Sequence, residues 1–198
     1  MCIRDRLREV PLGRDLEFDH ERFVARYNAD LANDLGNLLQ RTVGMAIKYQ
    51  NGVLGGPGDG DLTGLSNAAH EEARTYCDAM DSYELQTGLK AIWSLVRAGN
   101  LAVDTHAPWE LAKHPDKAVE LDAVLSQLVA LLHQIAILAY PFMPERSAAM
   151  AKALGQDSDP GMWRLDNLHD PSLAPRQVQE TEPLFPRLDP EEVIGSDA

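Results

Sequence analysis

The stretch YNADLANDLGNLLQR, residues Tyr27–Arg41, decides the fold because it carries two opposed faces of one helix. Apolar side chains recur there at steps of three and four residues, which predicts a helix with one buried side. They are Tyr27, Leu31, Leu35 and Leu38, and Val24 extends the same pattern just before the stretch. The opposite side carries Asn33, Asn37 and Arg41, spaced four residues apart. Asparagine is a mediocre helix former, so a face that met only water would be better served by Glu, Lys or Arg.

This polar column has two interpretations. Amides offer a donor and an acceptor together and a guanidinium offers several donors, which suits the base edges and phosphates of unpaired nucleotides. The alternative is that the column only keeps the helix in solution, as most polar helix faces do. The stretch by itself leaves both interpretations open.

The rest of the chain predicts further helices and no strand of useful length, so the expected fold class is an all-α bundle of about five helices. Capping residues, prolines and glycines set the boundaries. The expected helices are His20–Tyr49 capped by Asp19, Leu65–Met80, Leu85–Val103 after a capping signal at Asp81, Ser82 and Glu84, an almost wholly apolar helix from Asp116 to Pro141, and Met143–Leu154 closed by Gly155.

Two tryptophans have different expected roles. Trp93 falls on the apolar stripe of its helix and is expected to lie in the core. Trp109 follows Pro108, which suits the first position of a short helical turn. A ring at such a junction is held stiffly at an edge, where it can serve as a core anchor or as a platform for one base, worth about 1–3 kcal/mol.

Composition predicts one cytoplasmic domain. The 198 residues, 44% of them hydrophobic, suffice for one substantial core. The longest apolar run, Leu128–Ala139, is too short for a membrane span, and no secretory signal is recognisable. Cys2 and Cys77 lie in unrelated contexts, so neither a disulfide framework nor a zinc pattern is expected.

The formal charge of −13 and the pI near 4.8 argue against a protein that holds nucleic acid by bulk attraction to phosphate. Much of the excess is local, because the residues after Gly155 include ten Asp and Glu against three Arg. We therefore expect this chain alone to bind RNA weakly, through a few base contacts.

No residue pattern predicts catalysis or a metal site. The only close pair of histidines, His106 and His114, lacks the motifs that accompany zinc ligands. The glycine-rich residues 55–60 lack the Gly-Lys-Ser/Thr ending of a phosphate loop, and Asp59 and Asp61 lack the further ligands of a calcium loop. We expect a simple connector there, and no catalytic residue or metal in this chain.

Four separated motifs resemble the methionyl-tRNA synthetases, which are class Ia aminoacyl-tRNA synthetases. In chain order they are NADLANDLGNLLQR (Asn28–Arg41), HAPWELAK (His106–Lys113), AILAYPFMPERS (Ala136–Ser147) and PLFPRLD (Pro183–Asp189). The resemblance implies a helical domain that reads the CAU anticodon of methionine tRNAs, within an enzyme that joins methionine to its tRNA using ATP.

The resemblance also implies the residues of the RNA site. In that family the tryptophan of an Ala-Pro-Trp motif stacks on anticodon bases, and an asparagine and an arginine four residues apart bind the cytosine at the first anticodon position. The matching positions are Trp109, Asn37 and Arg41, which are expected to converge on one open pocket. Asn33 and Lys113 are secondary candidates for RNA contact, although Lys113 more simply lies over its own short helix.

The chain departs from the family pattern just ahead of the Ala-Pro-Trp motif. The family has Asn, a basic residue and Tyr, where this chain has Asn100, Leu101 and Ala102. No RNA contact is therefore carried over to Leu101 or Ala102.

The family's ATP-handling signatures, His-Ile-Gly-His and Lys-Met-Ser-Lys-Ser, are absent from the sequence. We therefore expect no cofactor in this chain and no activation of methionine by it, with ATP and Mg²⁺ acting in a separate catalytic domain. The expected partners are methionine tRNA and that catalytic domain.

Three segments are expected. Residues 1–18 are a connector, of which 1–6 have no counterpart in the family and are interpreted as a non-native start. Residues 19–155 form the anticodon-binding domain. Residues 156–198 form an acidic, largely irregular tail, whose PLFPR motif packs on the catalytic domain or hangs free.

Three alternatives remain at this point. One is the related domain of a class Ia synthetase for isoleucine, valine, leucine or cysteine. The second is a helical protein-interaction module with no RNA role, which would suit the acidic charge. The third, a helical metalloenzyme, would need clustered ligands.

Overall fold

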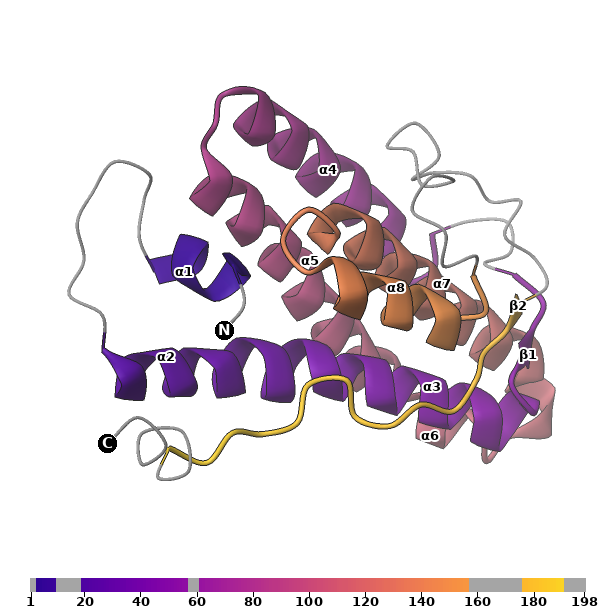
Figure 1. The fold of residues 1–198 in the computed structure, drawn as a ribbon. Coiled ribbons are helices and arrows are strands. Elements are labelled where there is room, and N and C mark those ends of the chain that lie inside the picture. Colours follow the sequence, from indigo (N-terminus) through magenta and orange to yellow (C-terminus); the bar gives the residue numbers. More distant parts are fainter. Residues whose placement is uncertain (1–2, 10–18, 57–60, 157–175, 191–198) are drawn as a thin grey trace.

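A helical rod runs without interruption from His20 to Gln50 along one edge of the molecule (Figure 1). The structure is a computed structural model that describes residues 3–9, 19–56, 61–156 and 176–190. The rod consists of α2 (His20–Tyr27), the π-helix η1 (Asn28–Gly36) and α3 (Asn37–Gln50). Asp19 caps it as predicted, since its carboxylate accepts hydrogen bonds from the backbone N–H groups of Glu21 and Arg22. Asn51, in the left-handed conformation, ends it.

The remaining helices pack beside the rod. They are α1 (Ile3–Glu9), α4 (Leu65–Asp81), α5 (Leu85–His106), α6 (Pro108–Leu111), the 3₁₀ turn η2 (Pro115–Lys117), α7 (Ala118–Ala139) and α8 (Pro144–Ala153). Two-residue strands, β1 (Val53–Leu54) and β2 (Arg176–Gln177), pair antiparallel. The all-α prediction is confirmed, and the predicted helix boundaries lie within a few residues of the observed ones.

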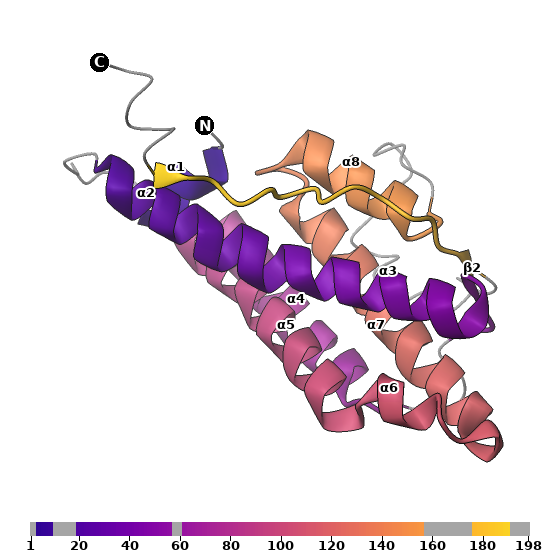
Figure 2. The ribbon, with the colours of Figure 1, turned by 90° about the horizontal axis from the view of Figure 1, so that it is seen from below.

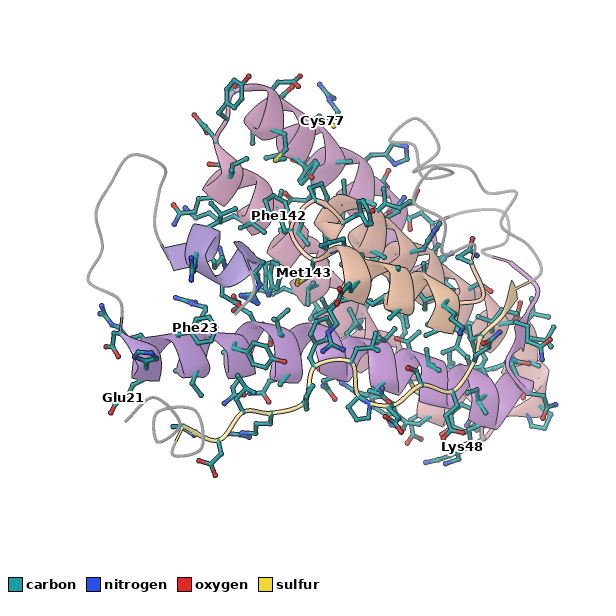
Figure 3. All side chains as sticks on the ribbon, viewed as in Figure 1. Glu21, Phe23, Lys48, Cys77, Phe142 and Met143 are labelled. Atoms are coloured by element: carbon teal, nitrogen blue, oxygen red, sulfur yellow. The ribbon has the colours of Figure 1, made fainter. Side chains whose placement is uncertain are left out.

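The central helix is α7, which contacts α3, α4, α5 and α8. By length and composition the segment Pro115–Ala139 would suit a membrane, but 72% of its most apolar window is buried inside the bundle. Phe142 and Met143, just beyond it, also point inward and are buried, whereas Glu21 and Lys48 project outward from the two ends of the rod (Figure 3). The apolar run is therefore the core of this domain.

One local prediction was wrong. The expected capping signal before α5 does not form: Asp81 is the last residue of α4, and Glu84 makes no side-chain cap. Tyr83 takes a positive φ of 61° instead, and the N–H of Glu84 donates to the carbonyl of Ala79 at 2.8 Å, so the backbone closes the turn itself. Within the expected N-terminal connector, Ile3–Glu9 forms a helix that packs on α5.

The winding of the rod changes at Asn28–Gly36, where the hydrogen bonds follow the π pattern. Such helices are rare and frequently occur at functional sites. A Cβ at Gly36 would lie 2.8 Å from the Leu31 carbonyl oxygen and 3.6 Å from Phe185. Glycine at this position therefore permits the π turn, whereas Phe185 lies at an ordinary van der Waals distance.

The segment 176–190 runs along the length of the rod (Figure 1 and Figure 2). Val178 and Phe185 are buried in the core. The Asn28 amide both donates to the Leu188 carbonyl and accepts from the Leu188 N–H, each at 2.8 Å. The prediction that PLFPR packs on another domain or hangs free was therefore wrong for Phe185, because its ring is buried in the core of this domain beside the rod.

Candidate nucleic-acid interface

Arg41 and Trp109, predicted as partners from widely separated motifs, meet on the surface of the bundle. The guanidinium carbon of Arg41 lies 5.6 Å from the centre of a Trp109 ring, within the range of a cation–π contact. Arg41 keeps 32% of its side-chain surface exposed, and Trp109 is half-buried with one side packed on the core. The pair therefore offers solvent a cation and an aromatic ring side by side.

The junction between α5 and α6 sets the position of Trp109. Ala107 ends α5 and precedes α6 with a left-handed backbone (φ 42°, ψ 64°), and Pro108 takes the first position of α6. A left-handed alanine is strained by about 1–2 kcal/mol, and such strain is often found beside functional sites. Pro108 and Leu111 are buried, which anchors the short helix. Trp109 is thus held by its neighbours on a sharp corner.

Asp104 is a third residue of the surface formed by Arg41 and Trp109, and it was not predicted from the sequence. Its carboxylate accepts a hydrogen bond from Nη2 of Arg41 at 2.9 Å while remaining 64% exposed. The arrangement holds the guanidinium near the indole. The signal available in the sequence was an acidic residue on the polar side of α5, less than two turns before Pro108.

Asn37 lies one helical turn before Arg41 on the same face, and Asn33 lies a further four residues back. Both side chains are exposed, and neither amide makes a hydrogen bond within the described parts of the chain. Both also line a groove of about 350 Å³ between the rod and the segment 183–185. Asn37 therefore borders both the arginine–tryptophan pair and the groove.

Lys113 is held away from this surface by a local partner. Its ammonium group lies 2.7 Å from Oε1 of Glu110, and both side chains are exposed. Leu101 is also exposed, at 68%, whereas Ala102 is buried. Asn100 is used within the fold, because its amide donates to the backbone carbonyls of Asp34 and Val96.

Burial shifts the acidity of one carboxyl near this face. The pKa of Asp34 is raised above 3.8 by desolvation, and further by the neighbouring Asp30 carboxylate, while Arg97 acts in the opposite direction. A raised pKa means that the ionised form is disfavoured in the fold. The carboxylate of Asp34, close to the exposed amides of the rod, is therefore destabilised by burial when it is ionised.

The features that could suggest a ligand elsewhere have structural roles. In residues 3–9, 19–56, 61–156 and 176–190, no group of three or more His, Cys, Asp or Glu gathers as metal ligands. Asp61 accepts hydrogen bonds from the N–H groups of Ser66 and Asn67 at the start of α4. Asp59 and residues 57–60 lie outside the described residues.

Two family models match the chain. Residues 55–193 match the anticodon binding domain of methionyl tRNA ligase, and residues 6–43 match a model described as tRNA synthetases class I (M). Asn37 and Arg41 thus fall in the second match, and Trp109 falls in the first.

Individual relatives agree with these models. The chain is 42% identical to the methionine–tRNA ligase of Bacillus subtilis over 194 residues, which is 96% of this chain and 29% of that protein. It is 40% identical to the methionine–tRNA ligase of Caldanaerobacter subterraneus over 196 residues, with shares of 96% and 30%. The chain therefore spans less than a third of the length of these curated relatives.

Solved structures show the same similarity in three dimensions. The free form of Mycobacterium tuberculosis methionyl-tRNA synthetase superposes with a TM-score of 0.83 and 29% identity, over 92% of this chain and 37% of that one. The same enzyme in complex with methionyl-adenylate gives a TM-score of 0.79 and 28% identity, over 91% of this chain and 36% of that one.

Proposed function

Because the chain belongs to the methionyl-tRNA synthetase family, whose anticodon-binding domain it matches over residues 55–193, we propose that it reads the CAU anticodon of methionine tRNAs. The observation that carries this proposal is the contact between Arg41 and Trp109, at 5.6 Å. These two residues come from the two separate family matches, and the fold brings them together with Asn37 at the surface.

Stacking supplies the affinity in this reading. An unpaired base lies on the exposed side of the Trp109 indole, and stacking on an aromatic side chain contributes about 1–3 kcal/mol per base. The ring is already fixed by Pro108 and by its packed side, so little side-chain entropy is lost when a base arrives.

Hydrogen bonds supply the discrimination. Cytosine presents an amino donor beside a ring nitrogen and a carbonyl that accept. The Asn37 amide can accept from the amino group, and the Arg41 guanidinium can donate to the two acceptors. A uracil at this position has an accepting carbonyl in place of the amino donor and a donating ring N–H in place of the accepting ring nitrogen, which leaves polar groups unpaired and weakens binding.

Asp104 acts as a positioning residue for this set. Its 2.9 Å hydrogen bond to Arg41 keeps the guanidinium beside the ring before RNA arrives. Because the ion pair is exposed, it contributes at most about 1 kcal/mol, and Arg41 can turn toward a base or phosphate at small cost.

At the level of the whole protein, we infer a cytoplasmic methionine–tRNA ligase that uses ATP with Mg²⁺ in a catalytic domain. The family and the bacterial ligases support this inference, as does the adenylate complex of the M. tuberculosis enzyme. This chain, which lacks both ATP-handling signatures, would then contribute recognition of methionine tRNA but no catalysis.

The test is a nuclear magnetic resonance titration of the ¹⁵N-labelled chain with an anticodon stem-loop bearing CAU and with one bearing a permuted triplet. We expect the indole N–H resonance of Trp109 to shift with CAU and to shift much less with the permuted loop. Trp93 provides an internal control, because it is 1% exposed and should not respond. Equal shifts with both loops would contradict recognition of the triplet, and no shift with either loop would favour a module with no RNA role.

A further inference from the structure

The segment 176–190, which runs along the rod (Figure 2), contacts both ends of the π segment. At the first residue of that segment, the Asn28 amide makes its two hydrogen bonds to the backbone of Leu188. At the last residue, Phe185 is buried beside Gly36, where a Cβ would lie 3.6 Å from it. The stretch of the rod that departs from the α pattern therefore coincides with the stretch between these two contacts.

The spacing of the two contacts fits a π winding better than an α winding. Phe185 and Leu188 are three residues apart, a span of at most about 10–11 Å. Eight residues of an α-helix, from Asn28 to Gly36, would rise about 12 Å. A π winding places more residues in each turn, so the same residues rise less. Pro186 has a fixed φ and disfavours a helical conformation of the residue before it, which makes the span between the contacts stiff. Both contacts are therefore made together more easily when the rod is shortened.

Gly36 permits the π winding but does not by itself select it. A Cβ at this position would lie 2.8 Å from the carbonyl oxygen of Leu31, which is five residues back and is brought close by the π pattern. Glycine removes that obstacle, yet glycine is equally compatible with an α winding. The contacts at the two ends supply a preference that Gly36 does not.

The winding also affects the position of Arg41. The Asn100 amide donates to the carbonyl of Asp34, which attaches the π segment to α5. Further along the rod, Arg41 reaches Asp104 at 2.9 Å and lies over Trp109. Because the rod is held against α5 at Asp34, a change of winding around that residue would move Arg41 relative to both partners.

We propose that docking of the segment 176–190 on the rod stabilises the π winding and thereby holds Arg41 beside Trp109. Asn28 and Phe185 are positioning residues in this arrangement, because they act on the surface through the backbone of the rod. Coupling of this kind is reciprocal. The docked segment favours the π winding, and the π winding favours docking.

Two substitutions disturb the two coupled elements separately, in a chain labelled with ¹⁵N and ¹³C and in the absence of RNA. Asn28→Ala removes both hydrogen bonds to Leu188. Gly36→Ala disfavours the π winding while leaving an ordinary 3.6 Å contact with Phe185. Couplings across the backbone hydrogen bonds of residues 28–36 distinguish carbonyl acceptors five residues back from acceptors four residues back. Hydrogen exchange at the Leu188 amide measures docking.

We expect acceptors five residues back and slow Leu188 exchange in the unmodified chain. Each variant should shift acceptors to four residues back and speed Leu188 exchange by about tenfold or more, the factor that one or two lost hydrogen bonds supply. Each should also weaken the nuclear Overhauser contact between Arg41 and the Trp109 ring. The proposal is overturned if Asn28→Ala frees Leu188 without changing the acceptors, or if Gly36→Ala changes the acceptors while Leu188 stays protected.

Gln40→Ala is the matched control. It also removes an amide that binds the segment 176–190, through the carbonyl of Thr181 at 3.3 Å, but Gln40 lies on α3 beyond the π segment. The acceptors and the Leu188 exchange should therefore stay as in the unmodified chain, and a change as large as that of Asn28→Ala would contradict the role given to the two ends. The stem-loop titration tests the proposed function separately, since no RNA is present here.

Discussion

Within the residues that the structure describes, two arginine–tryptophan–aspartate clusters differ in their access to water. At Trp93, which is 1% exposed, the guanidinium carbon of Arg4 lies 4.3 Å from the ring, and Arg4 contacts Asp5 and Asp30. The second cluster, described above, pairs Arg41 with Trp109 and Asp104 at the surface. The same three residue types therefore occur once inside the fold and once at its boundary.

Burial determines what each cluster can do. Inside, charges are costly: desolvation raises the pKa of Asp5, with Arg4 lowering it and Asp30 raising it further. Breaking such a pair leaves a buried charge unpaired, so the buried cluster must stay together. At the surface water screens the ion pair, and its partners can be exchanged for a ligand. The buried cluster is thus part of the core, whereas the ion pair of the exposed cluster can be broken at small cost.

The largest expected effect follows from removing the buried ring. Trp93→Ala should lower the free energy of unfolding by about 3–5 kcal/mol, because it leaves a large cavity and uncovers Arg4. Urea denaturation followed by circular dichroism measures this change. A loss equal to that of Trp109→Ala would show that the two clusters do not differ in the way described.

The second prediction concerns RNA binding, for which the exposed Trp109 should matter more than the buried Trp93. Trp109→Ala should weaken binding of the CAU stem-loop by tenfold or more, since one stacked base contributes about 1–3 kcal/mol. Its effect on unfolding should be smaller than that of Trp93→Ala, because only part of the ring is buried. Unchanged affinity in a folded variant would remove Trp109 from the site.

Asp104→Asn tests whether the exposed ion pair is exchangeable. The substitution removes one negative charge beside the RNA, while the amide oxygen of the new side chain can still accept the hydrogen bond that positions Arg41, so affinity should rise a few-fold, within the roughly 1 kcal/mol that exposed pairs contribute. The gain should shrink at high salt. Asp116→Asn, at another exposed aspartate, serves as the matched control. A loss of affinity would indicate that positioning by Asp104 outweighs its charge.

Asp34→Asn tests whether the ionised carboxylate of Asp34 destabilises the fold. Because the pKa of Asp34 in the fold lies above 3.8, the folded state binds more protons than the unfolded state between 3.8 and the raised value. Stability is therefore lost as the pH rises through that window. The variant should be the more stable form near neutral pH, and its advantage should vanish below pH 3.8. The measurement is the free energy of unfolding of the variant and of the unmodified chain at several pH values. A difference between the two that does not change with pH would contradict the prediction.

The smallest effect is expected at Lys113. Lys113→Ala should leave RNA affinity within about 0.5 kcal/mol, because the exposed ammonium is paired with Glu110. Isothermal titration with the CAU stem-loop measures the change. A tenfold loss would move Lys113 into the contact surface.

Much of the fold could be predicted because its boundaries depend on local chemistry. Asp19, Pro108, Pro144 and Gly155 are caps and breakers whose effect does not depend on distant residues. The turn before α5 was missed because backbone hydrogen bonds around Tyr83 replaced the expected side-chain cap. The π winding was missed because Leu31 and Leu35 are four residues apart, a spacing compatible with either helix type.

The site was predictable only in part. The convergence of Arg41 and Trp109 depends on contacts between α3 and the α5–α6 corner, and periodicity along one helix contains no information on such contacts. The family resemblance supplied that link. Asp104 and the groove wall at Pro183 and Leu184 were missed because each gains its meaning only when distant segments are packed together.

The π segment has one more consequence, which concerns angle rather than contact. Each residue of an α-helix turns the chain by about 100°, so the winding between Asn28 and Gly36 sets the direction in which everything after it faces. Removing a single residue there would rotate Asn37 and Arg41 around the axis relative to Phe23, without altering any of these side chains. The direction in which Asn37 and Arg41 face therefore depends on the number of residues in that segment as much as on their identity.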